Sequence, residues 1–120
     1  MAEHDHLYPQ ATRKLAEERT RLAPGTAEAF RAFSHSVFAE GALSQKTKQL
    51  IAVAAAHVTQ CPYCIRGHTR SALRYGASAE EIMEAIWVAA EMRAGAGYAH
   101  STLALDTIAD FQAQQAASKT

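Results

Sequence analysis

The chain has 120 residues and a mass of 13.0 kDa, which is enough for one hydrophobic core and too little for two. Its 12 basic and 12 acidic side chains give a formal net charge of zero, whereas a nucleic-acid-binding protein needs a clear basic excess. No apolar run reaches the ~18 residues that span a bilayer, and the N-terminus lacks the basic and then apolar order of a secretory signal. We therefore expect one cytoplasmic domain, residues 1–120, that binds neither nucleic acid nor membrane.

The balance of charge and apolar residues favours self-association. A protein near neutrality has little colloidal repulsion between its copies, and 48% of these residues are apolar. On a domain of this size we expect part of the apolar surface to be covered by another subunit.

The N-terminal half shows helical patterns, and no stretch alternates apolar and polar residues for long enough to indicate a strand. A first helix is expected from Gln10 to Leu22, ended by Pro24 and Gly25. Thr26 is expected to cap a second helix that runs to Phe38. The apolar stripe of this second helix is expected to lie in the core and consists of Phe30, Phe33, Val37 and Phe38.

Two further helices follow, separated by a short turn. Ser44 can cap a long alanine-rich helix that runs through Val58. The next helix is expected to start at Cys61 and Pro62, because proline is favoured at the first helical position. It should end at Gly76, since glycine suits a left-handed C-terminal cap.

The C-terminal third predicts two more helices. Ser78 and Glu81 form a capping box for the first of them. Its inward face is expected to hold Ile82, Met83, Ile86, Trp87 and Ala90. The glycine-containing segment 94–101 should interrupt the helix and form a close helix–helix contact, because small residues let a second backbone approach. A final helix is expected over 102–111, with flexible ends at 1–8 and 112–120. The predicted fold is all-α, with about six helices.

The residues whose side chains could react or bind a metal lie in the run HVTQCPYCIRGH. In a reducing compartment, two cysteines three positions apart are typical of a redox or metal site rather than of a structural staple. With Cys61 at a helix start, Cys64 and His68 fall with it within about 60° of one helix face. The partial positive charge of the helix N-terminus favours the thiolate of Cys61, while the spacing lets His68 exchange a proton with Cys64. The pattern predicts a dithiol that is readily oxidised and re-reduced.

Other interpretations of this run stay open. His57, Cys61, Cys64 and His68 could together bind a metal ion, although structural zinc usually joins two well-separated ligand pairs. The pair could also serve a redox-sensing module, or a helix junction without chemistry. A glutaredoxin-type fold is excluded, because that fold needs a strand before the motif and this sequence predicts a helix there. We favour redox catalysis and expect no resident metal or cofactor.

The run LSQKTKQLIAVAAAHVTQCPYCIRGHTRSALRYGAS, with EEIMEAIWVAAEMRAGAGYAHS after it, resembles the AhpD-like alkylhydroperoxidases of the carboxymuconolactone decarboxylase superfamily. The resemblance covers about residues 28–105. It implies an all-α fold that assembles into trimers or hexamers, and a peroxidase cycle that uses Cys61 and Cys64. It also implies that Cys64 attacks the hydroperoxide, that Cys61 resolves, and that His68 relays protons. Electrons would return from a dithiol donor, either a lipoyl protein or a thioredoxin-like partner.

One position departs from this family. The family pattern carries a glutamate twelve residues before the first cysteine, where it acts as general base, and this chain has Gln49 there. A neutral amide cannot accept the proton, so general-base help worth roughly 10²–10⁴-fold is at stake. His57 could take over the relay, or it could simply be satisfied by a backbone carbonyl. A decarboxylase or lactone chemistry of the same superfamily is the alternative that needs no dithiol.

The other histidines carry weaker expectations. His100 could line the same pocket or a surface between subunits, although a histidine without neighbours of its kind is more often structural. Surface positions are expected for His4, His6 and His35.

Overall fold

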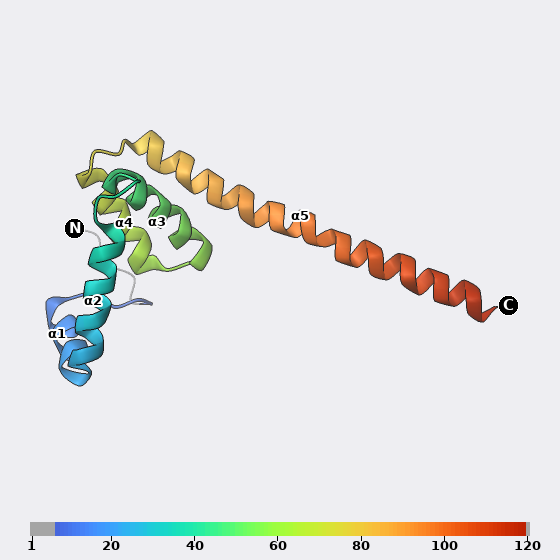
Figure 1. The fold of residues 1–120 in the computed structure, drawn as a ribbon, viewed down its shortest axis with the longest axis horizontal. Coiled ribbons are helices and arrows are strands. Elements are labelled where there is room, and N and C mark those ends of the chain that lie inside the picture. The colour runs from blue at the N-terminus through green and yellow to red at the C-terminus, as the bar shows by residue number, and fades with distance from the viewer. Residues whose placement is uncertain (1–6, 120) are drawn as a thin grey trace. The chain divides into compact units, whose positions relative to one another are not determined.

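The computed structural model describes residues 7–119, whose regular structure is helical without any strand (Figure 1). The five helices are α1 (Arg13–Leu22), α2 (Pro24–Phe38), α3 (Gln45–Thr59), α4 (Pro62–Arg74) and α5 (Ala79–Ser118). The all-α prediction is confirmed, with five helices in place of about six. None of these described helices is both long and apolar enough to cross a membrane. The chain forms two compact units, which divide between Lys48 and Gln49.

The first unit contains the hairpin of α1 and α2, and both of these helices start at different residues from those expected. Thr12 caps α1 by accepting a hydrogen bond from the Leu15 amide over 3.2 Å, so the helix starts at Arg13 rather than Gln10. The second helix starts at Pro24, with Thr26 already inside it. The expected Thr26 cap is wrong because proline lacks the N–H that a cap would satisfy and therefore fits the first turn directly.

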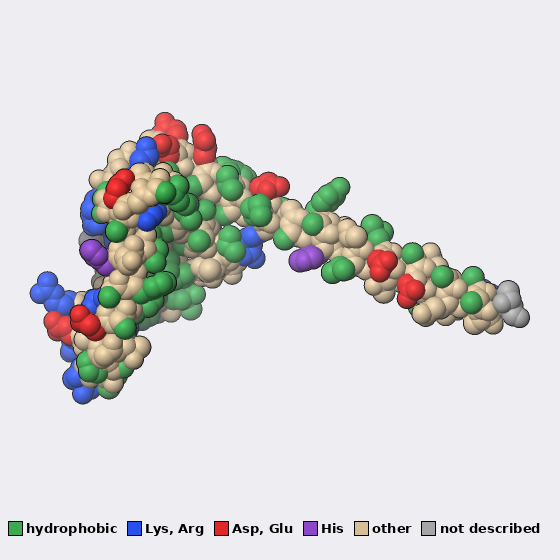
Figure 2. All heavy atoms as spheres, viewed as in Figure 1, with side chains coloured by type: hydrophobic (Ala, Val, Ile, Leu, Met, Phe, Trp, Pro, Cys, Tyr) green, Lys and Arg blue, Asp and Glu red, His purple; other side chains and the backbone are tan. Residues whose placement is uncertain are grey.

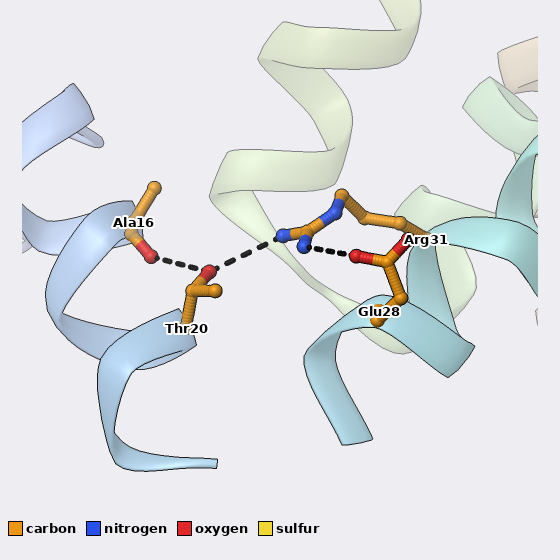
Figure 3. Close-up of polar contacts among 4 residues, drawn as sticks. All are labelled: Ala16, Thr20, Glu28 and Arg31. Atoms are coloured by element: carbon orange, nitrogen blue, oxygen red, sulfur yellow. Dashed lines mark hydrogen bonds and ion pairs between the residues drawn. The ribbon is translucent and has the colours of Figure 1, made fainter. Parts of the chain in front are cut away.

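Polar contacts of Arg31 connect α2 to α1 (Figure 3). The guanidinium donates to Thr20 Oγ1 over 3.2 Å and to Glu28 over 3.2 Å. Thr20 in turn donates to the Ala16 carbonyl one turn earlier, over 3.0 Å. Beside these contacts lies a cavity of about 510 Å³, lined in part by Ala27 and Phe30. All of its lining residues belong to the hairpin, and none is a predicted site residue.

The expected core position of the α2 aromatic stripe is wrong. Phe30 and Phe33 are 67% and 64% exposed, Val37 is also exposed, and Phe38 is half-buried. The two phenyl rings contact one another with their centroids 6.4 Å apart. Helical spacing identifies an apolar face but does not identify what covers it, and two helices form only one packed layer.

The turn into α3 is held by two capping devices. Ser44 accepts a hydrogen bond from the Thr47 amide over 3.1 Å, which confirms it as the cap of α3. The ammonium group of Lys48 donates to the carbonyls of Val37 and Ala39, over 2.8 and 2.6 Å. A cation at this position satisfies carbonyls that the end of α2 leaves without helical partners.

The second unit has a small core between α3, α4 and α5. Val53 and Ala72 are fully buried and pack with Ala77 and Ile82, while Leu50 and Ile86 lie against this cluster. The inward positions expected for Ile82 and Ile86 are therefore correct. Those expected for Met83, Trp87 and Ala90 are wrong, since all three are exposed and Ala89 is buried in their place. The physical reason is that α4 covers a single face of α5, and these three residues lie on another face.

Left-handed residues end both α3 and α4. Gly76 has φ 92° and closes α4, with Gly76 N–H donating to the Leu73 carbonyl over 3.0 Å, as the sequence predicted. Gln60 has φ 58° and occupies the same position after α3, where Cys61 N–H donates to the Ala56 carbonyl over 3.2 Å. A side chain in this backbone conformation costs about 1–2 kcal/mol. The turn before the cysteine motif therefore carries strain that the turn after α4 avoids.

We expect Gln60→Gly to raise the free energy of unfolding by about 1 kcal/mol, because glycine removes the left-handed penalty. Gly76→Ala should lower it by a similar amount, and only through φ, because a Cβ there meets nothing within 4 Å. Urea denaturation of both variants measures the two changes. Equal effects of the same sign would contradict this account of the turns.

The capping box of α5 is confirmed, but its expected interruption is wrong. Ser78 Oγ accepts from the Glu81 amide over 3.0 Å, and Ser78 N–H donates to the Glu81 carboxylate over 2.8 Å. From there a single helix of 40 residues runs to Ser118, through both the glycine segment 94–101 and the tail that was expected to be flexible. Each glycine costs about 1 kcal/mol without ending a helix, and the surrounding alanines favour its continuation. Beyond residue 95 every described residue is exposed, and Figure 1 shows this half of α5 extending away from α3 and α4.

Candidate active site

Cys61 occupies the N-cap of α4, as the sequence predicted. Its backbone is extended, with φ −103° and ψ 104°, and Pro62 follows as the first helical residue. Cys61 Sγ accepts a hydrogen bond from the Cys64 amide over 3.2 Å, in the position that a serine or aspartate oxygen usually holds. An amide that points at sulfur stabilises negative charge there, so the helix start favours the thiolate form.

The two cysteine sulfurs lie 2.6 Å apart and share a hydrogen bond. Both thiols are free and half-buried. The hydrogen bond from Cys64, helped by the Cys64 amide, lowers the pKa of Cys61. The same hydrogen bond raises the pKa of Cys64, and its burial adds to the rise. Cys61 is therefore the sulfur that ionises first. As a thiolate it can only accept, so the Cys64 thiol then donates to it across the same contact.

Gln49 and His68 form the second element of the site. Gln49 lies on α3, is only 6% exposed, and accepts a hydrogen bond from His68 Nδ1 over 2.7 Å. Because an amide oxygen can only accept, this contact places the imidazole proton on Nδ1 and makes Nε2 the basic nitrogen. The family resemblance indicated that Gln49 replaces a glutamate. It did not indicate that the Gln49 side chain orients His68. Helical spacing places His68 on the same face of α4 as Cys64, four residues away.

His57 does not join this group by any contact that the structure describes. Its Nδ1 donates to the Val53 carbonyl one turn earlier, over 2.8 Å, which matches the backbone-satisfied alternative. Within residues 7–119, no three His, Cys, Asp or Glu side chains are placed to hold a metal ion. The four-ligand metal site considered from the sequence is therefore not formed by these side chains.

Arg93 makes a contact near the cysteine motif that the sequence did not single out. Its guanidinium donates to the Val58 carbonyl over 2.8 Å, which links α5 to the last turn of α3, directly before the cysteine motif. Arg93 is the first residue of the segment RAGAGYAHS. The expectation drawn from the sequence for that segment concerned only its small residues. His35 and His100 are exposed, and no described contact connects either to the cysteines. His4 and His6 lie outside the described residues.

Comparison with known proteins identifies related sequences and structures. Residues 24–107 match the carboxymuconolactone decarboxylase family. A Paracoccus denitrificans protein named "Uncharacterized protein 4 in cox locus" is 61% identical over 101 residues, which cover 84% of this chain and 90% of that protein. A crystal structure from Methanobacterium thermoautotrophicum has a TM-score of 0.65 at 36% identity, over 68% of this chain and 92% of its own.

A second structural relative has a suggested role. It is a carboxymuconolactone decarboxylase family protein from Thermotoga maritima, for which involvement in antioxidative response has been suggested. Its TM-score is 0.53 at 34% identity, over 64% of this chain and 71% of its own.

Proposed function

This chain belongs to the carboxymuconolactone decarboxylase family, and we propose that it is a thiol-dependent peroxidase that reduces hydroperoxides through Cys61 and Cys64. The observation that carries the proposal is the pair of sulfurs 2.6 Å apart whose pKa values move in opposite directions. One sulfur is prepared as a nucleophile, and the other stays protonated beside it. The antioxidative role suggested for the Thermotoga maritima relative supports the same chemistry.

The proposed cycle has three steps. A cysteine thiolate attacks the terminal oxygen of the hydroperoxide, so that the O–O bond breaks and the sulfur becomes a sulfenic acid. The alkoxide takes up the proton that the thiol released on ionising and leaves as the alcohol. The second cysteine attacks that sulfur, so that an S–S bond forms and water leaves. A dithiol donor then reduces the disulfide by exchange and is itself oxidised to a disulfide.

We assign the first attack to Cys61, although the family resemblance implies Cys64. The thiolate is the reactive form of cysteine, and the hydrogen bonds described above lower the pKa of Cys61 and raise that of Cys64. Cys64 then resolves the sulfenic acid from 2.6 Å away. Nε2 of His68, oriented by Gln49, accepts the proton that Cys64 releases in this second step.

The electron donor is proposed to be a dithiol protein of the lipoyl or thioredoxin-like kind in a reducing compartment such as the cytoplasm. Disulfide exchange requires that the attacking thiol reaches a sulfur along the S–S axis. Both sulfurs are only half-buried, at the first turn of α4, so an external thiol has access to the pair.

A hydroperoxide should remove two free thiols per chain, and a dithiol such as dihydrolipoamide should restore both. Thiol titration before and after each addition measures this directly. The matched control is the double variant Cys61→Ser with Cys64→Ser, which should consume no peroxide. Thiols that persist in the wild-type protein under excess hydroperoxide would refute the proposed function.

A further inference from the structure

The cavity between α1 and α2 is a second candidate site, distinct from the cysteine motif. Its volume of about 510 Å³ lies within the range of roughly 300–1,000 Å³ that is typical of cavities for small molecules. At the ~30 Å³ that a water molecule occupies in the liquid, this volume has room for roughly 15 non-hydrogen atoms. Neither the two cysteines nor Gln49 and His68 line it, and the proposed peroxidase cycle makes no use of it.

Apolar side chains make up half of the lining of this cavity. They are Ala16, Ala23, Ala27 and Phe30, and the other lining residues are two threonines and two arginines. The Phe30 side chain is 67% exposed to water, so a ligand that covers its ring is favoured by the hydrophobic effect. The lining therefore suits a ligand with an apolar body.

The charged residues that line the cavity are both arginines, and no carboxylate is among the described lining residues. Arg31 is held by Thr20 and Glu28, each of which accepts one N–H (Figure 3). A guanidinium has about five N–H donors, so several remain for a ligand. Arg19 makes no hydrogen bond or ion pair with any residue that the structure describes. The lining thus carries two positive charges whose donors are not exhausted by contacts within the chain.

The hairpin around the cavity is also positively charged. Residues 13–38 contain five basic and three acidic side chains, a net charge of +2 in a chain whose total is zero. Figure 2 shows Lys and Arg side chains gathered over α1. In addition, α2 begins at this cavity without a side-chain cap, because its N-cap residue is Ala23. The amides of its first turn add partial positive charge, so the electrostatics favour an anion.

We propose that this cavity binds a small amphipathic carboxylate, with its apolar body against Phe30 and its carboxylate at Arg19 and Arg31. A guanidinium binds a carboxylate through paired N–H donors, which favours an anionic over a neutral head group. The apolar lining favours an alkyl chain or an aromatic ring over a polar body, whose own polar groups would be left without partners. The site is independent of the proposed peroxidase cycle.

Titration calorimetry with dodecanoate, below its micelle concentration, tests the proposal. Its roughly 14 non-hydrogen atoms match the volume of the cavity. We expect dodecanoate to saturate one site per chain. Acetate, which lacks the apolar body, should not bind at the same concentration. Dodecyltrimethylammonium has the same alkyl chain with the opposite charge and should bind at least about tenfold more weakly.

Two outcomes of this titration would overturn the proposal. Equal affinity for the anion and the cation would mean that the alkyl chain binds to exposed apolar surface without any contribution from the arginines. A lack of dodecanoate binding, as would follow if a second copy of the chain already filled the cavity, would mean that the cavity does not take a ligand of this class.

Variants of α1 locate the bound dodecanoate. Arg19→Gln should weaken binding about fivefold, the effect of losing one solvent-exposed charge pair, and should leave the fold intact because Arg19 makes no described contact. The matched control Lys14→Gln removes the same charge from the same helix, about 140° around its axis, and lines no part of the cavity. It should leave the affinity unchanged.

Ala16→Leu tests the apolar part of the site. The larger side chain occupies part of the cavity while keeping a strong helix former in α1, so dodecanoate should bind more weakly at unchanged far-UV circular dichroism. Equal losses in Lys14→Gln and Arg19→Gln, or full affinity in Ala16→Leu, would place the ligand elsewhere and overturn the proposal. Peroxide reduction enters none of these measurements, so they stand or fall separately from the proposed function.

Discussion

Replacing Cys64 with serine should end peroxide turnover while leaving a single oxidation of Cys61 intact. The serine hydroxyl can still donate to Cys61 Sγ, and the amide of residue 64 keeps its hydrogen bond, so the features that lower the pKa of Cys61 largely remain. Without a second thiol no disulfide forms, and the sulfenic acid persists. A trapping reagent such as dimedone, followed by mass spectrometry, should therefore label Cys61 stoichiometrically.

The matched variant Cys61→Ser should lose turnover and also slow the first oxidation. Burial continues to raise the pKa of Cys64, and each unit of pKa reduces the thiolate fraction at neutral pH tenfold. We expect the first oxidation at pH 7 to be slower than in Cys64→Ser, because less of the attacking sulfur is present as thiolate.

The pH dependence has a defined sign. A lowered pKa means that Cys61 is already ionised at lower pH, so the oxidation rate of Cys64→Ser should reach its plateau below the pH at which an ordinary cysteine does. The rate of Cys61→Ser should still be rising there. If Cys61→Ser is the faster variant, Cys64 is the attacking thiol, and the family resemblance is the better guide to the order.

Local sequence signals predicted much of the fold because their physics is local. Ser44, the Ser78–Glu81 box, Pro62 and Gly76 each satisfy or remove backbone groups within a few residues, and all four behave as expected. Periodicity was a weaker guide, because it identifies an apolar face without identifying the surface that covers it. Trp87 has the correct spacing for a core and is nevertheless exposed, because α4 covers another face of α5.

The sequence predicted which residues form the candidate site, but it did not predict how all of them contact one another. The spacing from Cys61 to Cys64 and His68 follows from one helix and could be derived from the sequence. The contact between Gln49 and His68 joins two helices and spans 19 residues, so no local pattern reveals it. The resemblance drew attention to position 49 because glutamine replaces the family's glutamate there. The structure shows that this glutamine accepts a hydrogen bond from His68.

Restoring a carboxylate at this position should have a large effect on activity. Gln49→Glu keeps an acceptor within reach of His68 Nδ1, and its negative charge favours the imidazolium form. It also supplies a group that can accept a proton, so we expect peroxide turnover to rise toward the 10²–10⁴-fold that general-base catalysis contributes. Steady-state peroxide reduction with a saturating dithiol donor measures the gain.

A second substitution tests whether position 49 acts by orienting His68 or by accepting a proton. Gln49→Met has a similar length but cannot accept from His68, so it leaves a partly buried N–H without this partner, at a cost of about 1–3 kcal/mol. We expect lower turnover and a lower urea midpoint. Equal turnover in the Gln49→Glu and wild-type proteins, with a loss only in Gln49→Met, would mean that position 49 orients His68 and that another group is the base.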